Sequence, residues 1–242
     1  MASELRVEES PVGPVIRPPD PAETVILYVH GDRDLSGDPE PALDHAGRLA
    51  ARTRATVVCT RYRPAFPASL DDVQAAYDYG QASGPVVVAG GRLGAGLAAS
   101  LLVRLRDSGA APPRCAVLIS ALLDLTMESQ SLLLNARADP TFDVAGLRRQ
   151  VARYAGGTAP TDPLLSPLYA NLHGLPPIQL LTAGTDPLLD DSLTFAARAA
   201  RSGVTVDLRV RPDHAGLRGE AITAMASFMA TWSPAERTVR PA

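Results

Sequence analysis

Lysine is absent from this sequence of 242 residues, in which all 23 basic residues are arginine. Its absence excludes Schiff-base chemistry and general-base catalysis by a lysine amine. It also excludes a P-loop, whose phosphate-binding motif contains an essential lysine. Cysteine is scarce, since only Cys59 and Cys115 are present. Both border apolar runs, which indicates buried thiols in a reducing compartment and makes a disulfide or redox pair the weaker alternative.

Long apolar runs and a strong net charge are missing as well. No apolar run reaches the length of a transmembrane helix, and the first residues lack the apolar core of a signal peptide. The formal net charge of −3 argues against non-specific binding to nucleic acid. We therefore expect a cytoplasmic protein without a membrane span and without a nucleic-acid partner.

Side-chain groups that would hold a metal or a nucleotide are also missing. No cluster of histidine, cysteine and carboxylate residues has the spacing of metal ligands. The glycines at positions 90, 91, 94 and 96 do not fit the G-x-G-x-x-G pattern, which leaves a nucleotide site as a weak alternative. We expect neither a metal nor another cofactor.

Apolar segments supply the framework that is present, because 46% of the residues are hydrophobic. Apolar β-branched runs alternate with helical patterns, which predicts one α/β domain over residues 1–242. We expect a mostly parallel central sheet with helices on both faces. The expected strands are 24–29, 56–60, 86–89, 114–120, 178–183 and 205–210, and the expected helices are 41–53, 70–80, 95–105, 190–202 and 215–232.

Three smaller features complete the expected outline. Residues 1–23 are rich in proline and contain two candidate edge strands, 5–7 and 12–16. Residues 124–154 alternate between helical and loop-like patterns. Ser69 precedes the helix expected at 70–80, and its hydroxyl is a suitable N-cap.

The segment 85–105 has the frame of a nucleophile elbow. A buried strand over 86–89 leads into a turn with three glycines among residues 90–94, and a helix follows. In such an elbow, G-x-S-x-G, the glycines relieve crowding at a strained turn and the central serine attacks the substrate. The central position here holds Arg92. An arginine side chain cannot form an acyl-enzyme, because its guanidinium stays protonated.

Polar side chains follow the ends of the other expected strands. His30 and Gly31 follow the first core strand, Asp186 follows strand 178–183, and His214 follows strand 205–210. In a parallel sheet the functional site lies at the carboxyl ends of the strands. The order Arg92, Asp186, His214 is that of nucleophile, acid and histidine in an α/β-hydrolase triad. We expect Asp186 and His214 to lie within hydrogen-bond distance of each other.

From residue 25 onward the chain resembles the hormone-sensitive-lipase-like branch of the α/β-hydrolase fold, which includes many bacterial carboxylesterases. The resemblance rests on the histidine-glycine segment, a tyrosine-arginine and proline-rich stretch, and the segments that lead to the acid: 27–32, 61–68, 119–129, 162–180 and 183–192. Matched residue by residue, it places the acid on Asp186, the histidine on His214 and the family's serine on Arg92. His30, by this resemblance, orients its loop.

Two further departures from the family pattern stand out. The family's oxyanion segment H-G-G-G reads His30-Gly31-Asp32-Arg33 here, so a carboxylate and a guanidinium replace two glycines whose backbone N–H groups, with that of Leu93, would stabilise an oxyanion. Family members also carry an N-terminal helical cap. The short segment before the first core strand predicts a short or absent cap and a more open site.

Arg92 has three interpretations that the residues leave open. It can be a decayed elbow position whose side chain reaches solvent. It can bind a carboxylate, phosphate or enolate with its planar fork of donors. It can also form an internal ion pair with Asp32 or Asp34. Asp186 and His214 are, correspondingly, either structural remnants or a working general base.

Three functions follow from these readings. The first is a pseudo-hydrolase, a pseudoenzyme with a degenerate triad that binds a small molecule or a partner. The second is a non-hydrolytic enzyme in which the His214–Asp186 pair abstracts a proton and Arg92 holds the anion. The third is a weak hydrolase in which the pair activates water. The expected ligand is a small molecule with a carboxylate or an enolisable carbonyl, and a homodimer stays an open alternative.

Overall fold

The computed structural model describes residues 5–31, 35–137 and 142–232. Its strands form one sheet in the order β1-β2-β4-β3-β5-β6-β7-β8. β1 and β2 pair antiparallel at one edge, and the remaining neighbours from β4 to β8 are parallel. The strands are β1 (Arg6–Glu8), β2 (Val15–Arg17), β3 (Val25–Val29), β4 (Thr56–Cys59), β5 (Val86–Gly91), β6 (Ala116–Ile119), β7 (Ile178–Ala183) and β8 (Val206–Arg211). The mostly parallel sheet confirms the fold class predicted from the sequence.

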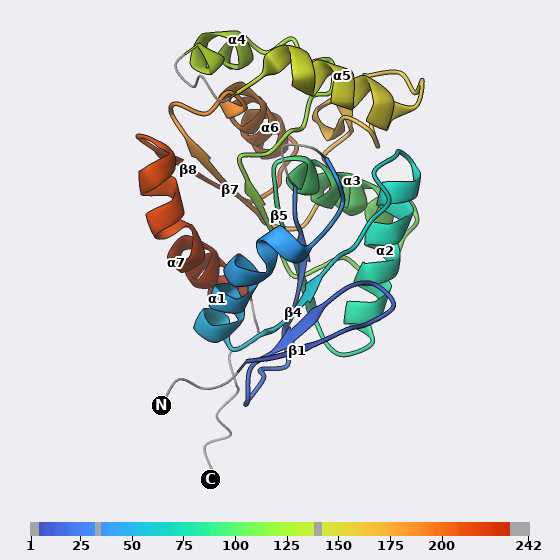
Figure 1. Cartoon of the computed structure of the whole chain (residues 1–242), viewed down its shortest axis with the longest axis vertical. Coiled ribbons are helices and arrows are strands. Elements are labelled where there is room, and N and C mark those ends of the chain that lie inside the picture. Colours follow the sequence, from blue (N-terminus) through green and yellow to red (C-terminus); the bar gives the residue numbers. More distant parts are fainter. Residues whose placement is uncertain (1–4, 32–34, 138–141, 233–242) are drawn as a thin grey trace.

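Helices cover both faces of this sheet (Figure 1). Buried residues of α1 and α7 pack against one face, and those of α2, α3 and α6 pack against the other. The helices are α1 (Leu43–Thr53), α2 (Ala68–Gln81), α3 (Leu93–Asp107), α4 (Gln130–Ala136), α5 (Val144–Ala155), α6 (Leu189–Arg201) and α7 (His214–Trp232), with 3-10 turns η1 (Glu40–Ala42) and η2 (Pro167–Tyr169).

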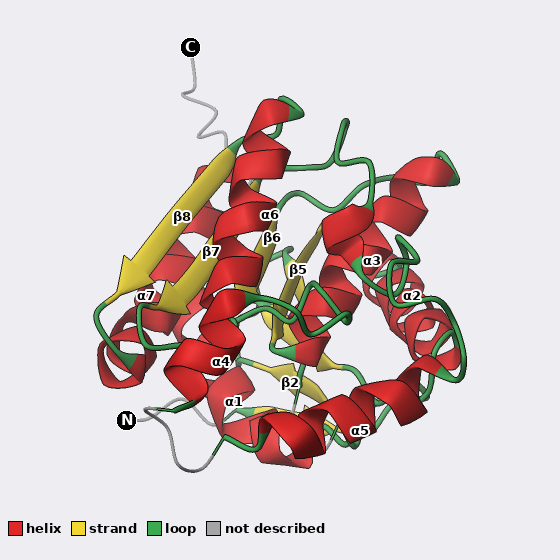
Figure 2. Ribbon diagram, turned by 90° about the horizontal axis from the view of Figure 1, so that it is seen from above, coloured by secondary structure: helices red, strands yellow, loops and turns green. Residues whose placement is uncertain are grey.

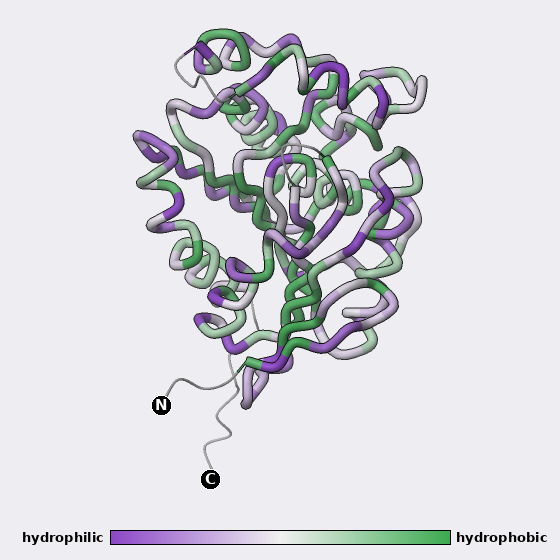
Figure 3. Tube along the Cα trace, in the orientation of Figure 1, coloured by the Kyte–Doolittle hydropathy of each residue, from purple (hydrophilic) through white to green (hydrophobic). Residues whose placement is uncertain are grey.

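Alternation along the central strands divides the core between the two faces. In β3, Leu27 and Val29 face the cluster under α2 and α3, whereas Ile26 and Tyr28 face the cluster under α1 and α7. Both faces of such a strand are covered, which is why these runs are apolar throughout. Figure 3 shows this hydrophobicity along the strands in the middle of the molecule.

The described residues ahead of β3 form the β1–β2 hairpin and contain no helix. The two edge strands expected from the sequence are therefore present, shifted by one to three residues. α4 and α5, which lie between β6 and β7 in the chain, cross the end of the sheet where the strands have their carboxyl ends (Figures 1 and 2).

Candidate ligand site at the elbow

Arg92 is the only residue between β5 and α3. Its backbone has a φ of 51° and a ψ of −119°, a conformation that L-residues rarely adopt and that costs about 1–3 kcal/mol. Three hydrogen bonds hold this turn. The Arg92 N–H donates to the Ile119 carbonyl at 3.0 Å, and the Arg92 carbonyl accepts from the N–H groups of Gly96 at 3.2 Å and Leu122 at 3.1 Å. The sharp strand-to-helix turn predicted from the sequence is thus present.

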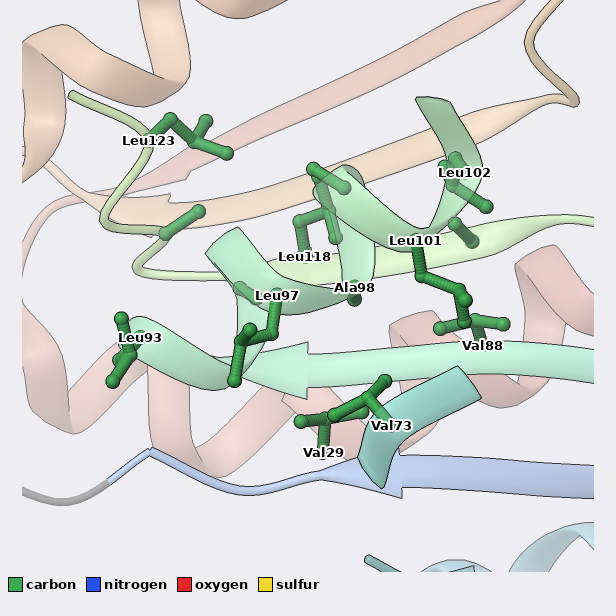
Figure 4. Packing of buried hydrophobic residues seen from close by; sticks show 14 of the residues in the cluster. Val29, Val73, Val88, Leu93, Leu97, Ala98, Leu101, Leu102, Leu118 and Leu123 are labelled. Carbon is green, nitrogen blue, oxygen red and sulfur yellow. The ribbon is translucent and has the colours of Figure 1, made fainter. Parts of the chain in front are cut away.

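Close backbone contacts explain the glycines around this turn. A Cβ atom on Gly94 would lie 2.1 Å from the Val29 carbonyl oxygen, and one on Gly90 would lie 2.6 Å from the Gly94 carbonyl oxygen. Gly31 meets the same turn from β3, since its Cβ would lie 2.2 Å from the Gly91 carbonyl oxygen. No side chain fits at these positions. Figure 4 shows the first turns of α3, including Leu93 and Leu97, packed beside β5 and Val29.

Arg92 lines a cavity of about 210 Å³. Most of the wall is apolar: Leu35, Leu93, Leu122, Phe142, Gly146, Leu147 and Leu188 contribute to it, together with Asp143 and Gln150. The wall draws on the loops after β3, β5, β6 and β7 and on the start of α5. Arg92 is partly exposed. Within the described residues, no group accepts a hydrogen bond from its guanidinium, and no carboxylate forms an ion pair with it.

Asp186 lies in the turn between β7 and α6 and is completely buried. Its N–H donates to the Ala183 carbonyl at 3.0 Å, and its Oδ1 accepts from the Leu188 N–H at 3.0 Å. Asn135 of α4 fixes the same turn by donating to the Asp186 carbonyl at 2.8 Å. The second carboxylate oxygen, Oδ2, has no hydrogen-bond partner in the described part of the chain.

His214 is the first residue of α7 and is partly buried. In the described ranges no hydrogen bond or ion pair joins it to Asp186, so the expectation of a bonded pair is wrong for this structure. Only Pro212 and Asp213 separate β8 from α7, and Asp213 fixes the helix start by accepting from the Gly216 N–H at 2.8 Å. The His214 backbone therefore forms the first residue of α7.

His30 is almost fully buried at the end of β3. Its ring lies against the Tyr62 ring, with the centroids 5.0 Å apart and the planes 34° from parallel. The Tyr62 hydroxyl donates to the His30 carbonyl at 2.9 Å. These contacts position the backbone that leads into Gly31. Asp32, Arg33 and Asp34, which the sequence places next, lie outside the described residues.

A family model described as alpha/beta hydrolase fold matches residues 26–215 of this sequence. The chain belongs to the α/β-hydrolase family. An acetyl-hydrolase of Streptomyces hygroscopicus is 34% identical to it over 206 residues, which are 82% of this chain and 69% of the relative. The chain spans about two thirds of the length of the first curated relatives it matches.

Solved structures agree with this α/β-hydrolase assignment. An esterase/lipase from an uncultured bacterium is 31% identical, with a TM-score of 0.87 and coverage of 96% of this chain and 86% of that one. An esterase from the bacterial hormone-sensitive lipase family is 30% identical, with the same TM-score and coverage. Together these matches support the hormone-sensitive-lipase-like branch that the sequence motifs indicate.

The sequence alone did not identify one residue that shapes the site of this α/β-hydrolase. Asp191, in the first turn of α6, is buried, and its Oδ2 accepts hydrogen bonds from the N–H groups of Leu123 at 2.8 Å and Asp124 at 3.0 Å. It thereby fixes the loop that carries Leu122 into the cavity wall. Burial raises the pKa of Asp191 to about 7, against the opposing effect of those two hydrogen bonds. The sequence signal that could have identified it is the pair of adjacent aspartates, Asp190 and Asp191, at the start of an expected helix.

Among the described residues, no group of three or more histidine, cysteine, aspartate or glutamate side chains is arranged to hold a metal ion. In the same residues, no helix is long and apolar enough to cross a membrane.

Proposed function

We propose that this protein is a pseudo-hydrolase: a member of an esterase family that binds a small molecule in the elbow cavity and does not cleave it. The observation that carries the proposal is Arg92. It occupies the tip of the elbow, where the resemblance puts the family's serine, and it is one of the residues that line the cavity. A protonated guanidinium offers no lone pair for attack on an ester carbonyl.

The acid and the histidine support the same conclusion. A general base needs its imidazole oriented by a hydrogen-bonded partner. In the described residues Asp186 makes no such bond to His214, and its free Oδ2 stays inside the protein. In addition, the sequence continues from Gly31 with Asp32 and Arg33 in place of the glycines of an oxyanion hole.

A non-hydrolytic enzyme is the second candidate. The unpartnered Oδ2 of Asp186 favours it, because a fully buried carboxylate oxygen without a partner is costly. A movement that brought His214 to this oxygen would create a general base, with Arg92 available to hold an enolate. A weak hydrolase that activates water would need the same movement.

Intact-protein mass spectrometry tests the proposal. The purified chain is incubated with phenylmethylsulfonyl fluoride, which sulfonylates activated serines, and Arg92→Ser is treated in parallel as the variant that regains a hydroxyl. We expect the mass of the native chain to stay unchanged. A stoichiometric adduct on the native chain would reveal a nucleophile at another position and overturn the proposal.

A further inference from the structure

Among the described residues, the elbow cavity combines one cation, Arg92, with a mostly apolar wall. We infer that it binds a small monocarboxylate with a short apolar chain: the carboxylate lies on Arg92, and the chain lies among Leu93, Leu122 and Phe142. This inference rests on the proposed function and adds the chemical class, polarity and size of the ligand.

The head group follows from the charges around Arg92. The guanidinium presents a planar fork of donors that matches a carboxylate, and no described residue occupies that fork. Arg92 also precedes the 15-residue helix α3, so the positive end of the helix dipole adds to its charge. With a neutral or cationic head group, the described residues would leave this positive site without a paired counter-charge.

Within the described part of the chain, Asp143 is the one carboxylate in the cavity wall. Its side chain is 68% exposed and lies 3.7 Å from the Arg149 guanidinium, its Oδ2 being the nearer atom. Water screens its charge and Arg149 offsets it, so Asp143 does not cancel the attraction of Arg92 for an anion.

The size of the ligand follows from the cavity volume. About 210 Å³ is less than the roughly 300–1,000 Å³ of pockets that bind drug-sized molecules. At about 30 Å³ for each water-sized group, it holds about seven such groups. Hexanoate is of this size. Acetate would leave most of the apolar wall uncovered, and decanoate would extend beyond the cavity.

Isothermal titration calorimetry with the full chain tests the inference, using acetate, hexanoate, decanoate, 1-hexanol and hexylamine. Each added methylene should strengthen binding by about fourfold until the cavity is full. We expect hexanoate to bind most tightly. Arg92→Gln should weaken hexanoate binding by about tenfold or more, with little change for hexanol, which shows that the cavity is intact.

The control variant is Arg48→Gln. Arg48 lies on α1, which packs on the opposite face of the sheet, and its side chain is 69% exposed. This substitution removes the same charge and should leave hexanoate affinity unchanged. The inference would be overturned if hexanol and hexanoate bound with equal affinity, if Arg92→Gln left the affinity for hexanoate unchanged, or if no compound bound. The proposed function would instead be contradicted by a covalent adduct on the native chain or by ester turnover, whichever compounds bind.

Discussion

Arg92 adopts a backbone conformation that is strained for an arginine and would be unstrained for a glycine. The turn persists because three hydrogen bonds and the close packing of Gly31 and Gly94 fix it. The strained turn is present although Arg92 has no nucleophilic group. A ligand-binding role for the side chain gives a reason for keeping an arginine at this position.

The first prediction concerns this strain. Arg92→Gly should raise the free energy of unfolding by about 1 kcal/mol, since relief of about 1–3 kcal/mol exceeds the added entropy of an unfolded glycine, about 0.5–1 kcal/mol. Arg92→Ala, the control, keeps a Cβ and the strain and should show no such gain. Urea unfolding measures both. A glycine variant no more stable than the alanine variant would show that the turn is not strained.

The second prediction concerns repair of the elbow. Arg92→Ser restores a hydroxyl but leaves Asp32 and Arg33 after Gly31 in the sequence. Loss of one oxyanion donor typically lowers the rate by about 10²–10³-fold. We expect weak ester hydrolysis from the single variant and about a hundredfold more from Arg92→Ser with Asp32→Gly and Arg33→Gly. Ordinary esterase rates from the single variant would contradict this account of the His30 loop.

At the scale of elements, α5 is the part of the fold that the sequence predicted least. The sequence of residues 124–154 shows no sustained hydrophobic period, because α4 and α5 are fixed by contacts with residues that are distant in the sequence. The Tyr154 hydroxyl bonds to the Ser69 hydroxyl at 2.7 Å, and the Phe66 N–H donates to the Tyr154 carbonyl at 2.9 Å. Ser69, expected as an N-cap, lies instead inside the first turn of α2 and anchors α5.

The third prediction concerns the start of α6. The folded-state pKa of Asp191, about 7, lies above its ordinary value of 3.8. The unfolded carboxyl is therefore already ionised where the folded one still holds its proton, and this contribution to stability is lost as the pH rises through about 7. The carboxylates that oppose its ionisation are Asp124 and Asp190.

Asp191→Asn removes this titration. Between about pH 4 and 7 the free energy of unfolding of the native chain should fall more steeply with rising pH than that of the variant, and above about pH 8 the two slopes should agree. Urea unfolding at fixed ionic strength measures the two slopes. His45, whose pKa burial lowers from 6.5, adds the opposite slope at lower pH in both proteins and cancels in the comparison. Parallel curves would show that Asp191 is already ionised throughout this range.

For the whole molecule, the sequence predicted the sheet well because its strands are short apolar runs covered on both faces. The elbow was predictable from its glycines, of which Gly90 and Gly94 are required because a Cβ at either position would collide with the backbone. The relation between Asp186 and His214 was not predictable. Sequence motifs place both residues at the same edge of the sheet, but they do not specify whether the two side chains are hydrogen-bonded.

Steady-state hydrolysis of p-nitrophenyl butyrate by the purified full-length chain, with His214→Ala as the matched control, tests the central claim most directly. A chain with Arg92 at the elbow and no bond between Asp186 and His214 should release p-nitrophenol no faster than the control. Turnover of about 1 s⁻¹ or more, within the ordinary range of enzymes, that disappears in His214→Ala would contradict the account and show a working hydrolase.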